Sequence, residues 1–433
     1  MEFVSENLAV NEQGHLTIGG VDVLYLKEKY GTPLYVMDED MIRTHLRTYR
    51  EALNTYYEGN GLCQFASKAF CTKYMCNIVA EEGLGLDVVS GGELYTALSA
   101  KFPADKICFH GNNKTKDELM FAIGHDVGTI AVDNIYELEQ IDKIAGEQGK
   151  IQNVIFRIKP GIDAHTHDFI MTGQIDSKFG FALETGEALS AIALVKEKKN
   201  LYYKGLHCHI GSQIFEVEPF CETAKVMMSF IKEVKDKLGL ETDELDLGGG
   251  FGIRYVESDD PIAYDQYIKA VSKEVKEQAE ILDVKIPKIL MEPGRSIVAP
   301  AGITVYEVGC VKEIPGIRTY VSVDGGMADN PRYIMYGAEY SAVLANKAGE
   351  SADCIYTVAG KCCESGDLLV EHAKLPKVEV GDTLAVLATG AYNYSMASNY
   401  NRIPRPAVVM VSGRKDKLIV KRETFEDIIK NDL

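Results

Sequence analysis

Two adjacent cysteines late in the chain are the first residues whose types suggest chemistry. Cys362 and Cys363 lie in the stretch GKCCESGD, where Glu364 and Asp367 follow within four residues. These thiols could form a disulfide, bind a metal or supply a proton. A disulfide between adjacent residues needs strained geometry, and the ten cysteines are scattered along the chain, which contains no Cys-x-x-Cys pair. We therefore expect free thiols, and the proton source stays open.

Two His-x-His pairs, His165/His167 and His207/His209, raise the hypothesis of a metal-dependent hydrolase. Such a site in a barrel enzyme needs further His and Asp ligands from later strands. Only His372 follows His209 in the sequence. We keep the metal hydrolase as a minor alternative, expect no bound metal, and interpret His165 and His167 as loop residues.

A glycine-rich run at 248–252 suits an anion. Its spacing does not match G-x-G-x-x-G because position 253 is isoleucine, so we do not expect a dinucleotide site. Unobstructed backbone N–H groups at a strand-to-helix corner suit a phosphate. The formal net charge of -18 means that any anionic ligand needs such a local site, and it argues against nucleic acid or an anionic membrane as the main partner.

The elements that would position these residues follow a repeating pattern. Short apolar runs, each followed by a turn and then by helical spacing, begin near residues 62, 85, 106, 128, 153, 204, 244 and 287. Eight such units predict a closed (β/α)₈ barrel of the TIM type, and an open doubly wound sheet is the alternative. The residues just after each strand should line one mouth of the barrel; they include Lys68, Asp87, Arg157, His209, the glycines at 248–252 and Glu292.

The pattern changes after the stretch MEPGRSIVAPAG, where β-branched runs indicate antiparallel strands. The runs HLTIGG and VDVLYL near the N-terminus look similar, so we expect them to join this second domain. The predicted domains are a barrel at 34–293 and a β-rich domain formed by 1–33 and 294–433. The acidic N-terminal segment and the absence of a bilayer-length apolar run predict a cytoplasmic protein.

Eight strings occur in order along the chain: FASKAF, DVVSGGEL, HIGSQI, DLGGGFGI, EPGR, DGGMADN, CESGD and GAYNYSMASNYN. Together they resemble the pyridoxal-phosphate-dependent decarboxylases with an alanine-racemase-like barrel, and among these the diaminopimelate decarboxylases. The resemblance runs from about residue 20 to residue 412. It implies decarboxylation of meso-2,6-diaminopimelate to L-lysine and CO2, the last step of lysine biosynthesis.

The resemblance also implies the catalytic and cofactor-binding residues. Lys68 corresponds to the lysine that binds the aldehyde of pyridoxal phosphate. Cys363 corresponds to the proton donor, and an unperturbed thiol, with a pKa of about 8.5, still carries its proton at neutral pH. Glu292 resembles the carboxylate that keeps a proton on the cofactor's ring nitrogen, and His209 the residue stacked on the ring. The full implied cofactor set is Lys68, Asp87, His209, Ser212, Gly249, Gly250, Glu292, Gly294, Arg295 and Tyr392.

The implied substrate site contains arginines because diaminopimelate has a distal carboxylate that a guanidinium fork can bind. Its residues are Arg295, Arg332, Tyr336, Glu364 and Tyr392, with Glu364 contacting the distal amino group. Two positions depart from the family pattern, since Tyr333 and Lys361 stand where proline is common.

Three further expectations accompany this resemblance. A homodimer is implied, in which the partner subunit supplies the cysteine to each site. A sister decarboxylase acting on another diamino acid or on carboxynorspermidine is the second hypothesis. A non-catalytic regulator on the same fold is the third, although the presence of Lys68, Glu292 and Cys363 weighs against it.

Overall fold

The computed structural model describes residues 3–162 and 177–433. His165 and His167 lie outside the described residues. The chain contains two compact units, which we call the β-rich unit (Met1–Thr44, Ile253–Asp260 and Arg295–Leu433) and the barrel unit (His45–Gly252 and Pro261–Gly294). The sequence-based domain division at residues 34 and 293 stays a prediction.

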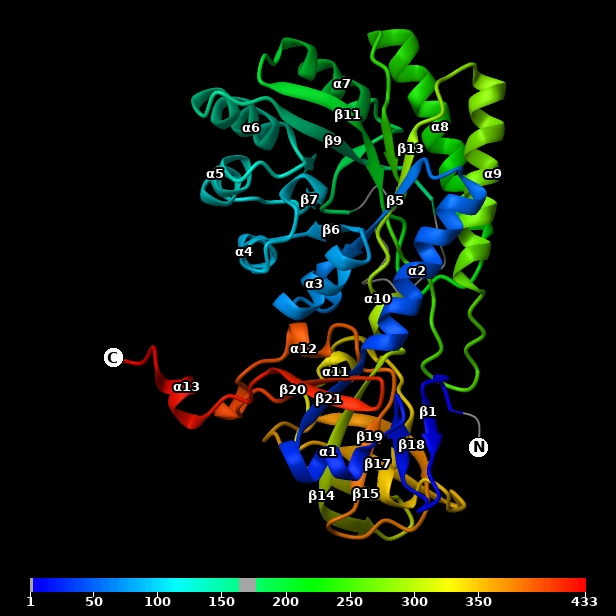
Figure 1. Ribbon diagram of the computed structural model, residues 1–433, viewed down its shortest axis with the longest axis vertical. Coiled ribbons are helices and arrows are strands. Elements are labelled where there is room, and N and C mark those ends of the chain that lie inside the picture. The colour runs from blue at the N-terminus through cyan, green and yellow to red at the C-terminus, as the bar shows by residue number, and fades with distance from the viewer. Residues whose placement is uncertain (1–2, 163–176) are drawn as a thin grey trace. The chain divides into compact units, whose positions relative to one another are not determined.

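The barrel unit is a closed ring of eight parallel strands (Figure 1). The strand order is β9-β11-β12-β13-β5-β6-β7-β8, and β8 pairs with β9 to close the ring. The strands are β5 (Gly61–Ala66), β6 (Gly85–Val88), β7 (Ile107–Phe109), β8 (Thr129–Val132), β9 (Gln152–Lys159), β11 (Leu201–Cys208), β12 (Glu244–Asp246) and β13 (Lys288–Met291). The short β10 (Phe181–Ala182) pairs with β9. Each strand coincides with one predicted apolar run, so the predicted barrel is confirmed and the open-sheet alternative is wrong.

Helices lie outside the ring of strands in the barrel unit (Figure 1). They are α2 (Glu39–Tyr56), which begins in the β-rich unit, α3 (Lys73–Glu81), α4 (Gly91–Ser99), α5 (Lys116–Gly124), α6 (Ile135–Glu147), α7 (Glu187–Leu194), α8 (Glu218–Leu238) and α9 (Tyr264–Leu282). Local sequence explains where several begin, because Ser90, Thr115 and Asn134 each accept a hydrogen bond from the N–H three residues later. The loops that follow β6, β7 and β8 therefore end in well-defined caps, which places their polar residues reproducibly.

The main sheet of the β-rich unit has the order β18-β17-β15-β14-β4-β20-β21, with β19 joining β14 to β16. Its strands are β4 (Leu34–Asp38), β14 (Gly302–Ile314), β15 (Arg318–Val323), β16 (Ala342–Leu344), β17 (Cys354–Ala359), β18 (Leu368–Leu375), β19 (Thr383–Val386), β20 (Ala407–Ser412) and β21 (Lys415–Val420). The sheet is mostly antiparallel, as predicted, but β15 with β17 and β4 with β20 are parallel pairs.

The N-terminal strands belong to the β-rich unit, as expected. β1 (Leu8–Val10), β2 (Leu16–Ile18) and β3 (Val21–Asp22) form a small antiparallel sheet. Its buried Leu16 and Ile18 share one core with Val36, Ile303 and Val409 of the main sheet.

The interpretation of VDVLYL as a strand was wrong beyond its first two residues, because α1 (Val23–Tyr30) starts there. The Asp22 carboxylate accepts a hydrogen bond from Leu24 N–H and caps this helix, a local signal that outweighs the β-branched residues.

Four short helices complete the β-rich unit: α10 (Arg295–Val298), α11 (Arg332–Tyr336), α12 (Asn393–Met396) and α13 (Phe425–Ile429). Among the described residues, no helix is both long and apolar enough to cross a membrane.

Candidate active site

Lys68 follows the first barrel strand directly. It lies in a single 3-10 turn, Ser67–Ala69, and its side chain is exposed while Ser67 and Ala69 are buried. Ser67 Oγ donates to Glu93 at 2.7 Å, and Ala66 N–H donates to the Pro293 carbonyl at 3.2 Å. The turn is thus anchored on both sides, which presents the Lys68 amine at the carboxyl end of β5.

The glycine-rich loop after β12 packs so closely that side chains would not fit. A Cβ on Gly249 would lie 2.2 Å from the Glu292 carbonyl oxygen, and one on Gly250 would lie 2.4 Å from the Gly211 carbonyl oxygen. The loop runs beside the segment that holds Ser212, since Ile214 N–H donates to the Gly250 carbonyl at 2.9 Å. The predicted phosphate-binding residues Ser212, Gly249 and Gly250 are therefore brought together on adjacent loops.

His209 extends from the end of β11 beside this loop. Gly249 N–H donates to its Nδ1 at 3.3 Å. Burial lowers the pKa of His209 well below its usual value, and the nearby cations Lys68 and Arg157 lower it further. The ring is therefore neutral at physiological pH, which suits stacking on a flat ligand.

Glu292, at the end of β13, lies in a buried cluster of four titratable side chains. Its Oε1 is 2.7 Å from His110 Nε2 and its Oε2 is 3.2 Å from His207 Nε2. The side-chain groups of His110, His207, Asp246 and Glu292 all lie within 4.8 Å of one another. Burial opposes ionisation of Glu292, but the two histidines lower its pKa well below the usual value.

Asp87, at the end of β6, is a second buried carboxyl near this cluster. Burial raises its pKa to about 7, an effect that His110 and Lys68 oppose and Glu292 reinforces. Its Oδ1 is buried and has no hydrogen-bond partner among the described residues. A buried polar atom without a partner is uncommon in native structures, so this oxygen is available for a polar contact with a ligand.

In the β-rich unit, Arg295 and Arg332 lie against the same tyrosine. Their guanidinium carbons are 4.9 and 4.8 Å from the centroid of the Tyr392 ring, and Arg332 is also 5.0 Å from the Tyr336 ring. Tyr255 accepts a hydrogen bond from Arg295 Nη1 at 2.6 Å. The structure thus brings together Arg295, Arg332, Tyr336 and Tyr392, four of the five residues expected to bind the substrate.

The residue Arg332 is 8% exposed, and its buried Nε has no hydrogen-bond partner among the described residues. An unpaired buried guanidinium N–H is costly, and a carboxylate would satisfy it. The cluster therefore has the chemistry of a carboxylate site.

The two cysteines have different environments, although they are adjacent. They lie in the loop between β17 and β18, where the Asp367 carboxylate accepts hydrogen bonds from Cys362 N–H at 2.7 Å and Met327 N–H at 2.6 Å. Cys362 is buried, and burial raises its pKa to about 11. Cys363 is exposed, and its N–H donates to Asn401 Oδ1 at 2.8 Å. Both thiols are free, so the expected absence of a disulfide between them is confirmed.

Glu364 follows on the same loop and is exposed; Tyr400 donates to its Oε2 at 3.5 Å. The loop packs on helix α11, because a Cβ on Gly366 would lie 2.8 Å from Ile334 Cδ1. The cysteine loop and the Arg332 helix are therefore neighbours within the β-rich unit.

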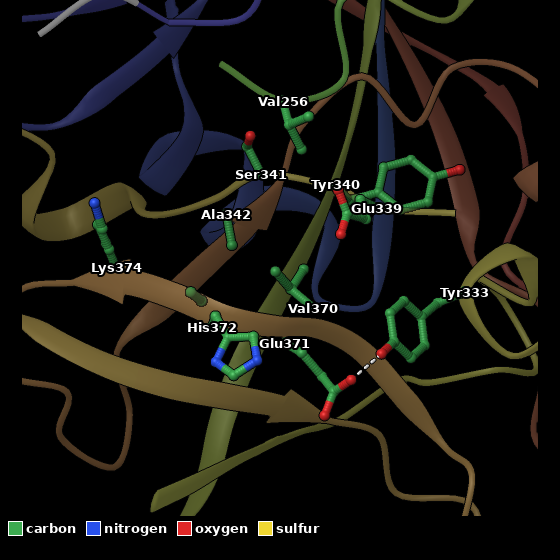
Figure 2. A pocket seen from close by; sticks show the side chains of 11 residues that line it. Val256, Tyr333, Glu339, Tyr340, Ser341, Ala342, Val370, Glu371, His372 and Lys374 are labelled. Carbon is green, nitrogen blue, oxygen red and sulfur yellow. Dashed lines mark hydrogen bonds between the residues drawn. The ribbon is translucent and has the colours of Figure 1, made fainter. Parts of the chain in front are cut away.

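A pocket of about 480 Å³ is lined by Tyr333 of helix α11 and by residues of strand β18 (Figure 2). Tyr333 points across it and donates to Glu371 of β18, which also pairs with Arg318 Nη1 at 2.9 Å. Tyr333 thus ties α11 to β18 by a side-chain contact.

Two members of the Glu292 cluster, His110 and Asp246, were not among the predicted site residues, and His207 was considered only as part of a metal-binding pair. A signal was present in the sequence. His110 ends the run KICFH and Asp246 lies within ELDLGG, so each is a polar residue in an apolar strand. Such residues are seldom buried without a partner.

The barrel residues fit pyridoxal phosphate in type and in placement. A primary amine on Lys68 can react with an aldehyde, the glycine loops can accept a phosphate, and the ionised Glu292 can hold a proton on a pyridine nitrogen. The unpartnered Asp87 Oδ1 shows that polar contacts remain to be made there. Of the predicted residues, Lys68, Asp87, His209, Ser212, Gly249, Gly250, Glu292 and Gly294 lie in the barrel unit, and Arg295, Arg332, Tyr336, Cys363, Glu364 and Tyr392 lie in the β-rich unit.

Comparisons with known proteins identify the family of the chain. The family model "Pyridoxal-dependent decarboxylase, pyridoxal binding domain" matches residues 39–299. Diaminopimelate decarboxylase of Bacillus methanolicus is 53% identical over 96% of this chain and 96% of its own length. The Bacillus subtilis (strain 168) enzyme of the same name is 51% identical over 98% of this chain and 96% of its own.

A crystal structure of diaminopimelate decarboxylase from M. jannaschii in complex with L-lysine superposes with a TM-score of 0.92. It is 37% identical and covers 100% of this chain and 99% of that one. These matches run through both units, and not through the barrel alone. The chain therefore belongs to the pyridoxal-dependent decarboxylases, within the diaminopimelate decarboxylase family.

Proposed function

We propose that the protein decarboxylates meso-2,6-diaminopimelate to L-lysine and CO2, the last step of lysine biosynthesis. The observation that carries the substrate assignment is the arginine cluster of the β-rich unit. Arg295 and Arg332 lie on one tyrosine ring, and Arg332 keeps a buried N–H without an acceptor among the described residues. A distal carboxylate would pair with this fork, whereas ornithine and lysine used as substrates have no second carboxylate to offer.

The cofactor of this family is pyridoxal phosphate, which supplies an aldehyde for covalent attachment and a ring that accepts electrons from the breaking bond. Lys68 would hold the aldehyde carbon, and Ser212, Gly249 and Gly250 would hold the phosphate. Gly294 lets the chain after β13 approach the turn that contains Lys68. His209 would contact the ring. Asp87 supplies a further polar contact. Glu292 keeps a proton on the ring nitrogen.

Cys363 is the proton donor to the α-carbon after CO2 leaves. Its exposure supports this role, because the neighbouring Cys362 is buried and has a raised pKa. Glu364, exposed on the same loop, contacts the distal amino group of the substrate. We propose a homodimer in which Cys363 of the partner subunit completes each site.

We also propose a cytoplasmic location. All ten cysteines are free in the structure. Free thiols in this number are typical of a reducing compartment.

The test is lysine release from meso-diaminopimelate by the purified protein with added pyridoxal phosphate, beside ornithine, lysine and carboxynorspermidine. Lysine formed from diaminopimelate alone is the expected result. Turnover of one of the other compounds would reject the substrate assignment and keep the cofactor chemistry. No turnover of any of them by a pyridoxal-phosphate-loaded protein would favour the non-catalytic regulator.

A further inference from the structure

The two histidines beside Glu292 have no part in the function proposed above. They lie at the ends of two different strands, His110 after β7 and His207 within β11, and their rings are 4.7 Å apart at 63°. Each places Nε2 against a different oxygen of one carboxylate. Side chains from two strands of the ring, β7 and β11, therefore converge on Glu292 at the end of β13.

We propose that His110 and His207 are positioning residues that clamp the two oxygens of Glu292 and hold its carboxylate ionised for the cofactor's ring nitrogen. This inference rests on the proposed role of Glu292. Neither histidine touches the substrate; both act through the carboxylate.

His110 is the closer half of the clamp. Its Nε2 lies 2.7 Å from Glu292 Oε1, and both side chains are almost fully buried, at 4% and 7% exposure. Neither of these two atoms has a partner in hydrogen-bond geometry among the described residues, so the contact is an electrostatic one. In a buried site with little water, this contact replaces the hydration that the carboxylate would otherwise need.

The tautomer of His207 follows from its two nitrogens. Nε2 faces Glu292 Oε2 at 3.2 Å, whereas Nδ1 is buried with no hydrogen-bond partner among the described residues. Burial lowers the pKa of His207 to about 4, so the ring carries one proton at neutral pH. That proton belongs on Nε2, because a bare Nδ1 lone pair is less costly to bury than an unpaired N–H. His207 therefore donates to Glu292.

Asp246 is the second carboxyl group of the cluster, and its protonation state complements that of Glu292. Its Oδ1 accepts Gly248 N–H at 2.9 Å, and burial together with the charge on Glu292 raises its pKa well above the usual value. Two adjacent carboxyl groups in an apolar site do not both ionise. Asp246 is thus the neutral acid, and the single negative charge lies on Glu292, where the histidines are.

Loss of the clamp should lower kcat more than it changes KM. Without His110, the ionised form of Glu292 loses its closest electrostatic contact, and the ring nitrogen loses the carboxylate that keeps it protonated. We expect kcat to fall by about 10-fold or more, because a nearby opposite charge commonly changes the ionisation equilibrium of a carboxyl group by at least that factor. KM for diaminopimelate should change by less than about twofold, because the arginine cluster is untouched.

The test uses the holoenzyme loaded with pyridoxal phosphate that carries ¹⁵N in the ring, because the ¹⁵N chemical shift reports protonation of that nitrogen directly. His110→Leu removes the donor, and His110→Asn has an amide too short to reach Oε1. His110→Gln keeps an amide near the position of Nε2. His125→Leu, at an exposed histidine that ends helix α5, is the matched control.

We expect the ring nitrogen to be protonated in the wild type, His110→Gln and His125→Leu. In His110→Leu and His110→Asn the ¹⁵N chemical shift should move toward that of a neutral nitrogen, and kcat should fall in the same two variants. Asp246→Asn should leave the signal unchanged, since the amide mimics a neutral acid. A protonated nitrogen in either His110→Leu or His110→Asn would overturn the clamp while leaving the role of Glu292 intact. A neutral nitrogen in the wild type would instead reject the role of Glu292 itself, and the clamp with it. Because both of these variants are measured, a failure of one to fold leaves the other decisive.

Discussion

Replacing Arg332 by methionine tests the carboxylate site most directly. The side chain of methionine keeps most of the apolar contact with the rings of Tyr336 and Tyr392, from which the guanidinium carbon lies 5.0 and 4.8 Å away. It removes the buried fork, including the Nε that has no partner among the described residues. The substitution thus isolates recognition of the carboxylate from packing.

The expected loss follows from the environment of the arginine. The side chain is 8% exposed, so an ion pair formed there is shielded from water and is not a weak surface contact. A charge-assisted contact of this kind contributes about 3 kcal/mol, which at 1.4 kcal/mol per factor of ten is about 100-fold. We expect kcat/KM for meso-diaminopimelate to fall by about that factor.

Two inhibitors separate the carboxylate from the rest of the molecule. L-Lysine, the product of the proposed reaction, keeps the distal carboxylate of the substrate, whereas 1,5-diaminopentane lacks it. Arg332→Met should raise the inhibition constant of L-lysine by about 100-fold and leave that of the diamine nearly unchanged. Arg414→Met, at an exposed arginine beyond strand β20, is the control for loss of one positive charge. Equal changes for lysine and the diamine would refute the assignment of Arg332 to the carboxylate.

Three further results are expected. Cys363→Ala should lower kcat by at least about 10²-fold with the cofactor still bound. The control Cys362→Ala, at the buried thiol, should keep a kcat close to that of the wild type. An equal fall in kcat in both variants would reject the assignment of Cys363 as the proton donor. Gly249→Ala should weaken binding of pyridoxal phosphate by about tenfold or more, because its Cβ would lie 2.2 Å from a carbonyl oxygen. The control Gly124→Ala, whose Cβ would lie 3.7 Å from its nearest neighbour, should leave the affinity unchanged. Similar affinities of the two variants, measured by titration of the apoprotein, would argue against phosphate binding by the glycine-rich loop. Burial raises the pKa of Asp329 from 3.8 to about 7, so between these pH values the folded protein binds a proton that the unfolded chain has released. The free energy of unfolding should therefore fall as the pH rises from about 4 through 7, by up to about 1.4 kcal/mol per pH unit. Urea unfolding of Asp329→Asn should show a shallower pH dependence, and an unchanged slope would contradict the raised pKa.

The sequence by itself determined the barrel and, through the family resemblance, the residues expected to carry its chemistry. Eight apolar runs separated by helical spacing predicted eight strands, because strands buried on both faces must be apolar along their whole length. The glycines after β12 were recognisable for a similar local reason, since only they fit where two backbones approach so closely. Local signals failed where they competed, as at VDVLYL, where the cap at Asp22 favours a helix.

Only the tertiary structure decided which of these residues act together. His110 and Glu292 are far apart in the sequence, and no periodicity shows that their side chains are 2.7 Å apart. Closure of the barrel brings the ends of β7, β11 and β13 to one place, and burial there determines which carboxyl is ionised. The same holds for Arg295 of α10 and Arg332 of α11, which meet on the ring of Tyr392. A protonation state depends on the distances and burial of all neighbouring charges, and those exist only once the chain has folded.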